Sequence, residues 1–252
     1  MKLLRMLLAV AFLSLCGQLA AAQTLTVAVA ANVKFAFDEL QAEFKQSSGI
    51  AINAVVASSG KITAQVKSGA PFDVFLSADM AFPAALHQQG YAVSAPKIYA
   101  YGVLVLWTLE PLDLSKGVQV LADSAVQKVA IANPRLAPYG EEAMRVLDYY
   151  KLRAAVAPKL IYGESIAQVN QYIDMRSASI GFTAKSVVLA PQLQGRGKWI
   201  EMPRESYSPI AQGVVILKHG AAHNAAAAQR FIEFIASPGA RGILQKYGYL
   251  LP

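Results

Sequence analysis

The stretch Val129-Ala130-Ile131-Ala132-Asn133-Pro134-Arg135-Leu136-Ala137-Pro138-Tyr139-Gly140 decides how this chain folds. Its first four residues form an apolar run that predicts a short buried strand, and residues 141–152 carry apolar side chains at helical spacing. Two prolines fix φ in the connection, so residues 133–140 are predicted to form a stiff arm. The arm presents Tyr139 at a strand-to-helix junction, where the free N–H groups of a helix start point outward. Such a junction can form half of a small anion-binding site.

The same alternation of strand and helix extends in both directions from this stretch. Short apolar runs predict strands at residues 25–30, 50–56, 73–76, 160–162 and 180–182. Amphipathic or helix-like patterns between them predict helices at residues 35–44, 61–67, 81–89 and 166–175. Strands that alternate with helices imply a parallel sheet covered on both faces, so the predicted fold class is α/β.

Two longer apolar stretches predict that the chain passes between two parallel-sheet domains. Residues 99–107 exceed one ordinary strand and are predicted to cross into a second domain, and residues 210–217 are predicted to cross back. Helices at residues 221–236 and 239–247 then complete the first domain. The predicted organisation is domain I at residues 23–103 plus 210–252 and domain II at residues 104–209. Two crossing strands without a Gly/Ser linker suit hinge motion.

The first 22 residues have the pattern of a secretory signal peptide. Lys2 and Arg5 precede an apolar run at residues 6–15, and Ala20-Ala21-Ala22 forms a small-residue cleavage site. We therefore expect a periplasmic protein. Cys16 could instead be a lipoprotein anchor, but Leu15 is bulkier than such sites usually accept, so we expect this cysteine to be removed with the signal peptide.

The remaining chain excludes several classes of protein by composition. It has no cysteine after Cys16, which excludes a disulfide, a thiol nucleophile and a thiolate metal site in the mature protein. No later apolar stretch reaches the ~20 residues of a membrane helix. Without Lys2 and Arg5 there remain 21 basic and 16 acidic residues, scattered along the chain. This distribution favours a solvated surface that attracts small anions over nucleic-acid binding.

Few residues suggest catalysis or a bound metal. The spacing His219-x-x-x-His223 could hold zinc on one helical face, but no third ligand lies nearby in sequence, so surface histidines are the preferred interpretation. No Gly-x-Ser-x-Gly elbow is present. Glu141 and Glu142 are adjacent and would point to different sides of a helix. The sequence therefore predicts neither an enzyme nor a metal or cofactor site.

Strand-to-helix junctions are the better candidates for a binding site. Ser58-Ser59-Gly60-Lys61 fails the P-loop pattern, because Val55 stands where a glycine is required. Its hydroxyl and N–H groups could still bind an anion at a helix start, although such a turn is usually only an N-cap. Ala31-Asn32, Pro138-Tyr139-Gly140 and Ser165-Ile166 occupy equivalent junctions. Ligands of open α/β sheets bind outside the carboxyl ends of the strands, so these junctions predict a cleft lined by neutral donors.

At these residues the chain resembles the periplasmic molybdate-binding proteins of ABC transporters, the ModA family, from about Leu25 to Pro252. The similar pieces are residues 30–32, 58–60, 69–79, 133–140 and 247–249, of which Gly-Ala-Pro-Phe-Asp-Val-Phe-Leu-Ser-Ala-Asp at 69–79 is the most distinctive. The Ala-Pro-Tyr-Gly motif at 137–140 is similar to the subgroup in which a tyrosine of this loop contacts the ligand.

The resemblance implies a type II periplasmic binding fold that closes on molybdate or tungstate. It further implies a monomer without a cofactor that delivers the oxyanion to a membrane permease. Carried over by position, the binding residues are Asn32, Ser59, Tyr139 and the backbone N–H of Ile166, with Ala31 and Ser58 adjoining.

Two positions depart from the family pattern. Ala31 stands where some relatives carry threonine, and Phe182 stands where others carry a ligand-binding tyrosine, whose phenol we expect Tyr139 to replace. A receptor for sulfate or another tetrahedral oxyanion is the alternative of the same class. The alternative from another class is a secreted hydrolase that uses Ser59 or Tyr139.

Overall fold

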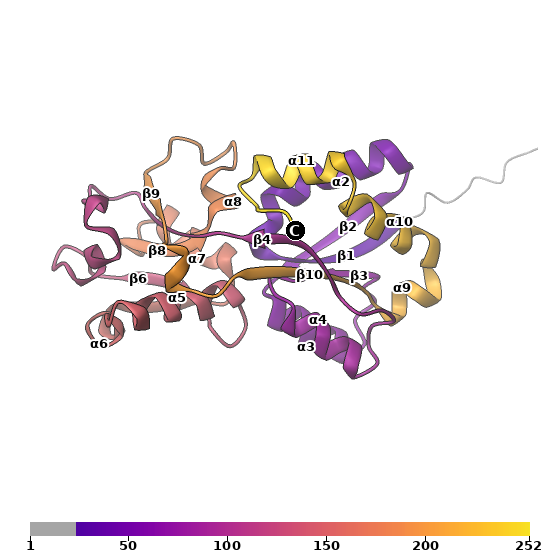
Figure 1. The fold of residues 1–252 in the computed structure, drawn as a ribbon, viewed down its shortest axis with the longest axis horizontal. Helices are drawn as coiled ribbons and strands as arrows, with labels where there is room; N and C mark the ends of the chain where they lie inside the picture. Colours follow the sequence, from indigo (N-terminus) through magenta and orange to yellow (C-terminus); the bar gives the residue numbers. More distant parts are fainter. Residues whose placement is uncertain (1–23) are drawn as a thin grey trace, which may run out of the picture.

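The computed structural model describes residues 24–252, so the predicted signal peptide at 1–22 and Cys16 lie outside the described residues. Two five-stranded sheets lie one beyond the other along the long axis of the molecule (Figure 1). We call each sheet, with the helices that pack on it, a lobe. Within residues 24–252, no helix has the length and apolar character needed to span a membrane.

The first lobe is built on a sheet with strand order β2-β1-β3-β10-β4. Helices α2, α10 and α11 pack on one face, and α3 and α4 pack on the other (Figure 1). A further helix, α9, precedes α10. The strands are β1 (Thr24–Ala30), β2 (Ala51–Ala57), β3 (Val74–Leu76), β4 (Lys97–Gly102) and β10 (Ile210–Ile216). The helices are α2 (Lys34–Ser48), α3 (Ser59–Lys67), α4 (Ala81–Gln88), α9 (Lys218–His223), α10 (Ala225–Ile235) and α11 (Pro238–Lys246).

The second lobe is built on a sheet with strand order β7-β6-β8-β5-β9. Helices α5 and α7 both pack against its strands β6 and β8. The strands are β5 (Leu104–Thr108), β6 (Val129–Ala132), β7 (Leu160–Gly163), β8 (Ile180–Ala184) and β9 (Lys198–Glu201). The helices are α5 (Pro138–Tyr149), α6 (Arg153–Val156), α7 (Ile166–Asp174) and α8 (Lys185–Val188). Short 3-10 segments are η1 (Ala31–Val33), η2 (Leu114–Ala122), η3 (Ala157–Lys159) and η4 (Arg204–Ser206).

The predicted α/β class is confirmed, but both sheets are mixed and not purely parallel. In the first sheet β1 pairs in parallel with β2 and β3, whereas β10 pairs antiparallel with β3 and β4. In the second sheet β6 is parallel to β7 and β8, whereas β5 is antiparallel to β8 and β9. The reversed strands, β10 and β5, belong to the segments that connect the sheets. The parallel strands of both lobes end near the junction between the lobes. A strand that enters a lobe from this junction is therefore antiparallel to them.

Three predicted elements differ from the structure for local reasons. The predicted strand at 99–107 is divided by Val103 into β4 and β5, which belong to different sheets. The predicted helix at 221–236 is interrupted at Asn224, whose φ of −137° is not helical. Helix α5 begins at Pro138, three residues earlier than predicted, because proline at the first helical position is already set to a helical φ. Tyr139 therefore lies in the first helical turn and not on an extended arm.

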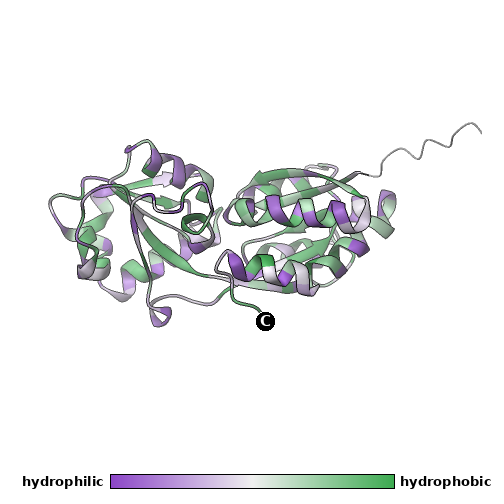
Figure 2. Cartoon of the chain, turned by 90° about the horizontal axis from the view of Figure 1, so that it is seen from above, coloured by the Kyte–Doolittle hydropathy of each residue, from purple (hydrophilic) through white to green (hydrophobic). Residues whose placement is uncertain are grey.

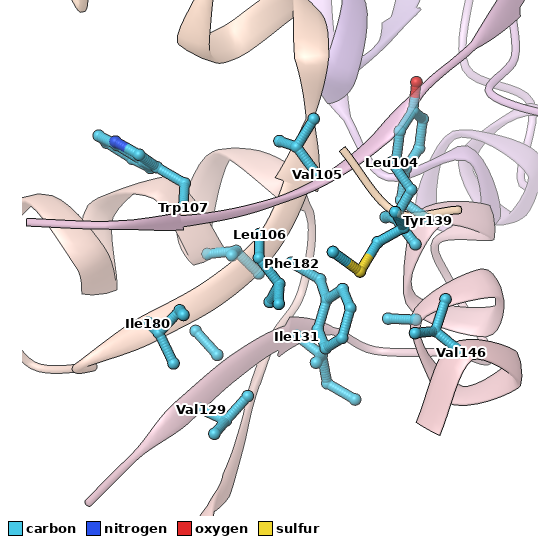
Figure 3. Packing of buried hydrophobic residues seen from close by; sticks show 14 of the residues in the cluster. Leu104, Val105, Leu106, Trp107, Val129, Ile131, Tyr139, Val146, Ile180 and Phe182 are labelled. Atoms are coloured by element: carbon cyan, nitrogen blue, oxygen red, sulfur yellow. The ribbon is translucent and has the colours of Figure 1, made fainter. Parts of the chain in front are cut away.

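The cores fill the space between each sheet and its helices, as the apolar strands in Figure 2 indicate. In the second lobe Leu106, Ile131 and Phe182 pack together, and Tyr139 enters the same cluster (Figure 3). Phe182 is 1% exposed and pairs with Leu106 across β8 and β5. Full burial of such a side chain contributes roughly 1.5–3 kcal/mol to folding. Phe182 thus serves the hydrophobic core at the position where relatives were expected to carry a binding tyrosine.

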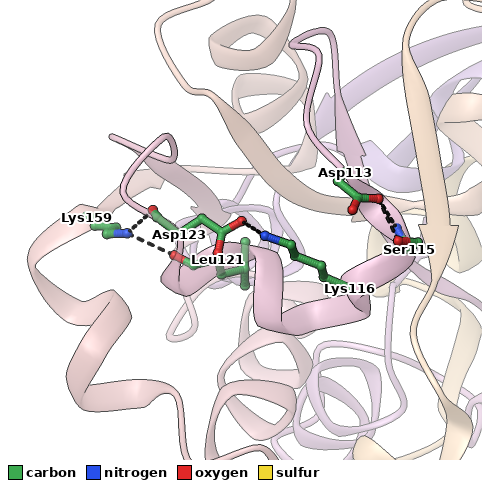
Figure 4. A network of polar contacts seen from close by, with 6 residues as sticks. All are labelled: Asp113, Ser115, Lys116, Leu121, Asp123 and Lys159. Atoms are coloured by element: carbon green, nitrogen blue, oxygen red, sulfur yellow. Dashed lines mark hydrogen bonds and ion pairs between the residues drawn. The ribbon is translucent and has the colours of Figure 1, made fainter.

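Polar contacts fix the long connection between β5 and β6, which the sequence patterns did not resolve. Lys159 Nζ donates to the carbonyl oxygens of Leu121 (3.1 Å) and Asp123 (2.7 Å), and Lys116 pairs with the Asp123 carboxylate at 2.8 Å (Figure 4). Asp113 caps η2 by accepting from the N–H of Ser115. The contacts of Lys159 tie η2 to η3.

Asp73 is a buried structural carboxylate in the first lobe. Its two oxygens accept from the N–H of Thr26 at 2.7 Å, from Asn224 Nδ2 at 3.0 Å and from His219 Nδ1 at 2.8 Å. These bonds join the start of β3 to β1, α9 and α10. His219 is therefore engaged by Asp73, and among the described residues no group of three or more potential ligands could hold a metal ion.

Candidate functional site

A small cavity lies where the strand-to-helix junctions of both lobes meet. Its volume is about 10 Å³, close to the minimum that holds one water-sized group. It is lined by Ala30, Ala31, Asn32, Ser58, Ser59, Ala78, Ala137, Pro138, Tyr139, Ser165 and Ile166. All six residues predicted from the sequence are in this set. The five lining segments follow the parallel strands β1, β2, β3, β6 and β7, as the rule for open α/β sheets requires.

Ser59 contributes a hydroxyl group that can donate a hydrogen bond, and the start of a helix, to the cavity wall. It is the first residue of α3, where backbone N–H groups have no partner inside the helix. Its Oγ accepts from the N–H of Ala78 at 3.0 Å, so the hydroxyl proton remains available for donation. Ile166 is likewise the first residue of α7 and brings a second helix start from the other lobe. Both helices direct the positive ends of their dipoles to the cavity.

Ser58 has a different partner, an acidic residue of the other lobe. Its N–H donates to Glu164 Oε1 at 3.3 Å, and its hydroxyl donates to the same oxygen. Ser58 Oγ also accepts from the N–H of Lys61 at 3.3 Å, which makes it the N-cap of α3. The donors of Ser58 are therefore occupied by a carboxylate in this structure.

Asn32 and Tyr139 line the cavity, but their polar side-chain atoms also join a buried network. Asn32 Nδ2 donates to Gln212 Oε1 at 2.9 Å and to the hydroxyl of Tyr249 at 3.2 Å. Both side-chain protons of Asn32 are thereby used, so a donor from Asn32 to a ligand would have to be its backbone N–H, which lies in the first turn of η1. The Tyr139 hydroxyl accepts from Gln212 Nε2 at 3.3 Å, which leaves its own proton free.

The arm before α5 closes against the first lobe through one glycine. Asn133 Oδ1 accepts from the N–H of Arg135 at 3.0 Å and shapes the turn, and the carbonyl of Leu136 accepts from the N–H of Gly60 at 2.8 Å. A Cβ on Gly60 would lie 2.9 Å from Leu136 Cα. The glycine of the Ser-Ser-Gly turn thus permits the close approach of the arm at Leu136.

The electrostatics of the cavity rest on neutral groups. Among the described residues that line it, none has a charged side chain. Burial raises the pKa of Tyr139 well above its usual value, and that of Tyr249 is raised for the same reason, so both phenols stay protonated as donors. Burial also raises the pKa of Asp79, near the cavity on the loop after β3, with a further contribution from the charge of Glu141.

Sequence patterns missed two residues next to the cavity, Glu164 and Gln212. Glu164 precedes the Ser165-Ile166 junction and could have been noticed by its position. Gln212 lies within an apolar strand, 0% exposed, and only the unusual presence of an amide in that strand marks it. Its 180-residue separation from Asn32 could not be bridged by sequence reasoning.

A larger hollow of about 700 Å³ lies on the second lobe, on the other side of the arm. Two of the three arginines that line it are paired with carboxylates, Arg145 with Glu141 at 2.7 Å and Arg153 with Asp148. These pairs are exposed, and exposed pairs remain solvated. The small cavity, with its buried neutral donors from both lobes, is the better candidate for specific binding.

Comparisons with known proteins agree with this architecture. The family model described as bacterial extracellular solute-binding protein matches residues 25–250. The molybdate-binding protein ModA of Rhodobacter capsulatus is 38% identical over 233 residues, which cover 92% of this chain and 90% of the relative. ModA of Azotobacter vinelandii is 36% identical over 232 residues, covering 91% of each.

A solved structure gives the same result. The periplasmic molybdate-binding protein of Azotobacter vinelandii superposes with a TM-score of 0.84 at 32% sequence identity, over 90% of this chain and 99% of that one. The region that the family model matches, residues 25–250, includes every junction that lines the cavity. The chain therefore belongs to the family of bacterial extracellular solute-binding proteins, and its relatives within that family include the ModA proteins.

Proposed function

We propose that this protein captures molybdate or tungstate in the periplasm and delivers the oxyanion to the permease of an ABC transporter. The observation that carries the proposal is the cavity at which helix starts and hydroxyl groups of both lobes converge without a charged lining side chain. A tetrahedral dianion can be held there by charge-assisted hydrogen bonds from neutral donors. As a member of a solute-binding family, the chain is a binding protein and not an enzyme.

The proposed ligand contacts are the hydroxyl groups of Ser59 and Tyr139 together with N–H groups of Ala31, Asn32 and Ile166. Ser58 would contribute only if Glu164 released its donors. A cavity of about 10 Å³ is too small for a tetrahedral oxyanion to enter without movement of the walls. We therefore propose that the lobes separate to admit the ligand and close around it, and that residues 23–103 plus 210–252 move against residues 104–209.

The partner and the assembly state follow from the same proposal. We expect the protein to act as a monomer, because a single chain supplies both lobes of the cavity. The permease can distinguish the closed arrangement of the two lobes from the open one. The ModA relatives support this assignment, since the chain covers nearly their whole length.

Sulfate remains the alternative ligand of the same chemical class, because it is also a tetrahedral dianion. The hydrolase alternative is less well supported by the geometry. The Ser59 hydroxyl oxygen accepts from a backbone N–H, and the described residues that line the cavity include no histidine or carboxylate to serve as a base.

Thermal unfolding of the mature protein tests the proposed ligand. At about 100 times Kd, a ligand that binds only the folded state adds ~2.7 kcal/mol. For a chain of this length, we expect an increase in Tm of roughly 5–10 °C with molybdate or tungstate. Phosphate serves as a control. An increase with sulfate alone would support the alternative, and no increase with molybdate or tungstate would exclude the proposal.

Glu164 gives a prediction about charge next to the site. Replacing Glu164 with glutamine keeps an oxygen that can accept from Ser58 but removes a negative charge near the bound dianion. We expect affinity for molybdate to increase by about fivefold at low salt, corresponding to about 1 kcal/mol, and the gain to shrink as salt screens the charge. Calorimetric titration measures it. Glu233→Gln, on the exposed surface of α10, is the control and should change the affinity little.

A further inference from the structure

Gln212 is an amide buried between the cavity and the strands that connect the lobes. It lies in β10 and is 0% exposed. The pairing of β10 with β4 shifts register between Gln212 and Gly213. Such irregularities redirect side chains locally. Gly213 is held in place by its N–H, which donates to Asp79 O at 3.1 Å, and by its carbonyl, which accepts from Ser77 at 2.8 Å.

The hydrogen bonds of Gln212 have a fixed polarity. Its Oε1 accepts from Asn32 Nδ2 at 2.9 Å and from the Tyr99 hydroxyl at 2.8 Å, which uses both lone pairs. Its Nε2 can only donate, and it does so to the Tyr139 hydroxyl at 3.3 Å. Because the Tyr139 oxygen accepts this hydrogen bond, the O–H of Tyr139 is left to donate to another group. Since Tyr139 lines the cavity, a ligand bound there could be that group.

Through these hydrogen bonds Gln212, which lies in a connecting strand, contacts cavity residues of both lobes. Asn32 belongs to η1 of the first lobe and Tyr139 to α5 of the second. Gly102, at the end of β4, permits the approach: a Cβ there would lie 2.0 Å from the Tyr139 hydroxyl and 2.7 Å from Gln212 Nε2. Any side chain at Gly102 would separate Tyr139 from Gln212.

We propose that Gln212 is a positioning residue of the oxyanion site, which directs the Tyr139 hydroxyl proton into the cavity and holds Asn32 beside it. This inference rests on the proposed function and deepens it. The amide supplies one donor and one acceptor end, which a carboxylate cannot do. An ionised carboxylate at this position would accept a hydrogen bond from the Tyr139 hydroxyl, which could then no longer donate to the ligand.

The test compares molybdate affinities of wild type and Gln212→Glu by calorimetry from pH 5.5 to 8.5. At pH 8.5 we expect Gln212→Glu to bind roughly 100-fold more weakly than wild type, and the ratio to recover toward low pH, since a protonated carboxyl again has a donor and an acceptor. Taking the ratio at each pH cancels titration of the anion itself. Parallel pH profiles for the two proteins would overturn the proposal.

The groups that face position 212 do not account for such a profile. The phenols of Tyr99, Tyr139 and Tyr249 all have a pKa raised by burial and remain protonated over this range. Asp79, whose carbonyl contacts Gly213 and whose pKa is also raised, is present in both proteins and cancels in the ratio.

A double-mutant cycle with Gln212→Met covers the case in which Gln212→Glu does not fold. If Gln212 acts through Tyr139, Gln212→Met should weaken binding about tenfold in wild type but less than about twofold in Tyr139→Phe. If the losses of affinity caused by Gln212→Met and Tyr139→Phe are additive, the proposal is overturned and the role of Gln212 is structural. Failure of wild type to bind molybdate or tungstate would instead refute the proposed function, so the two failures can be told apart.

Discussion

Replacing Tyr139 with phenylalanine should weaken binding of molybdate by roughly 10- to 150-fold. The substitution removes the hydroxyl that we propose donates to the bound oxyanion, and a hydrogen bond to a charged group is worth ~1.5–3 kcal/mol. The aromatic ring can keep its place in the core, since only the hydroxyl is lost. Calorimetric titration of the mature protein measures the loss.

Tyr99→Phe is the matched control for this prediction. It removes another buried phenolic hydroxyl, which bonds to the same Gln212 at 2.8 Å but does not line the cavity. Both variants should lose folding stability to a similar extent, about 1 kcal/mol. Only Tyr139→Phe should lose most of its affinity. If Tyr139→Phe and wild type bind molybdate equally well, the Tyr139 hydroxyl does not contact the ligand.

Replacing Gly60 with alanine should lower the affinity for molybdate by at least about tenfold while leaving the fold intact. The new Cβ would lie 2.9 Å from Leu136 Cα and 3.1 Å from its carbonyl oxygen, so the arm of the second lobe must move away. The hydrogen bond from Gly60 N–H to Leu136 O would be strained or lost, at ~1 kcal/mol or more in addition to the steric cost.

Folding stability should change less than affinity, because separation of the lobes relieves the clash with Leu136. Alanine within a helix is favoured over glycine by roughly 0.5–1 kcal/mol, so Gly60→Ala should not destabilise α3. Gly242→Ala in α11 is the control, because no atom lies within 4 Å of its added Cβ and its affinity should stay unchanged. Denaturant unfolding and calorimetry separate the two quantities. A Gly60→Ala protein with wild-type affinity would show that the arm contact does not govern closure.

The features of the fold that could be predicted from the sequence are those set by residues close together in the chain. The strand at Val129–Ala132 followed from its apolar run, and α7 from the spacing of Ile166, Val169 and Ile173. The direction of β5 and β10 within their sheets could not be predicted, because it depends on how the chain returns between lobes. The short β9 had no periodic pattern strong enough to identify it.

The candidate site divides in the same way. Ser59, Tyr139 and Ile166 could be selected because each follows a strand at a helix start, which is a local pattern. The partners of their neighbours could not be selected. Glu164 reaches Ser58 across 106 residues, and the contact of Gln212 with Tyr139 spans 73. Those contacts exist only once both lobes have folded and approached each other.

The sequence by itself determined the alternation of strands and helices, and it placed hydroxyl and amide donors at the junctions, because helix starts, prolines and apolar periodicity act within a few residues. Only the tertiary structure decided which donors remain free. Hydrogen bonds saturate, and the partner that uses Ser58 or Asn32 comes from a distant part of the chain. The stretch 129–140 thus specified a strand, a turn and a helix, whereas the tertiary structure brought the Tyr139 hydroxyl beside Gly102 and within hydrogen-bond distance of Gln212 Nε2.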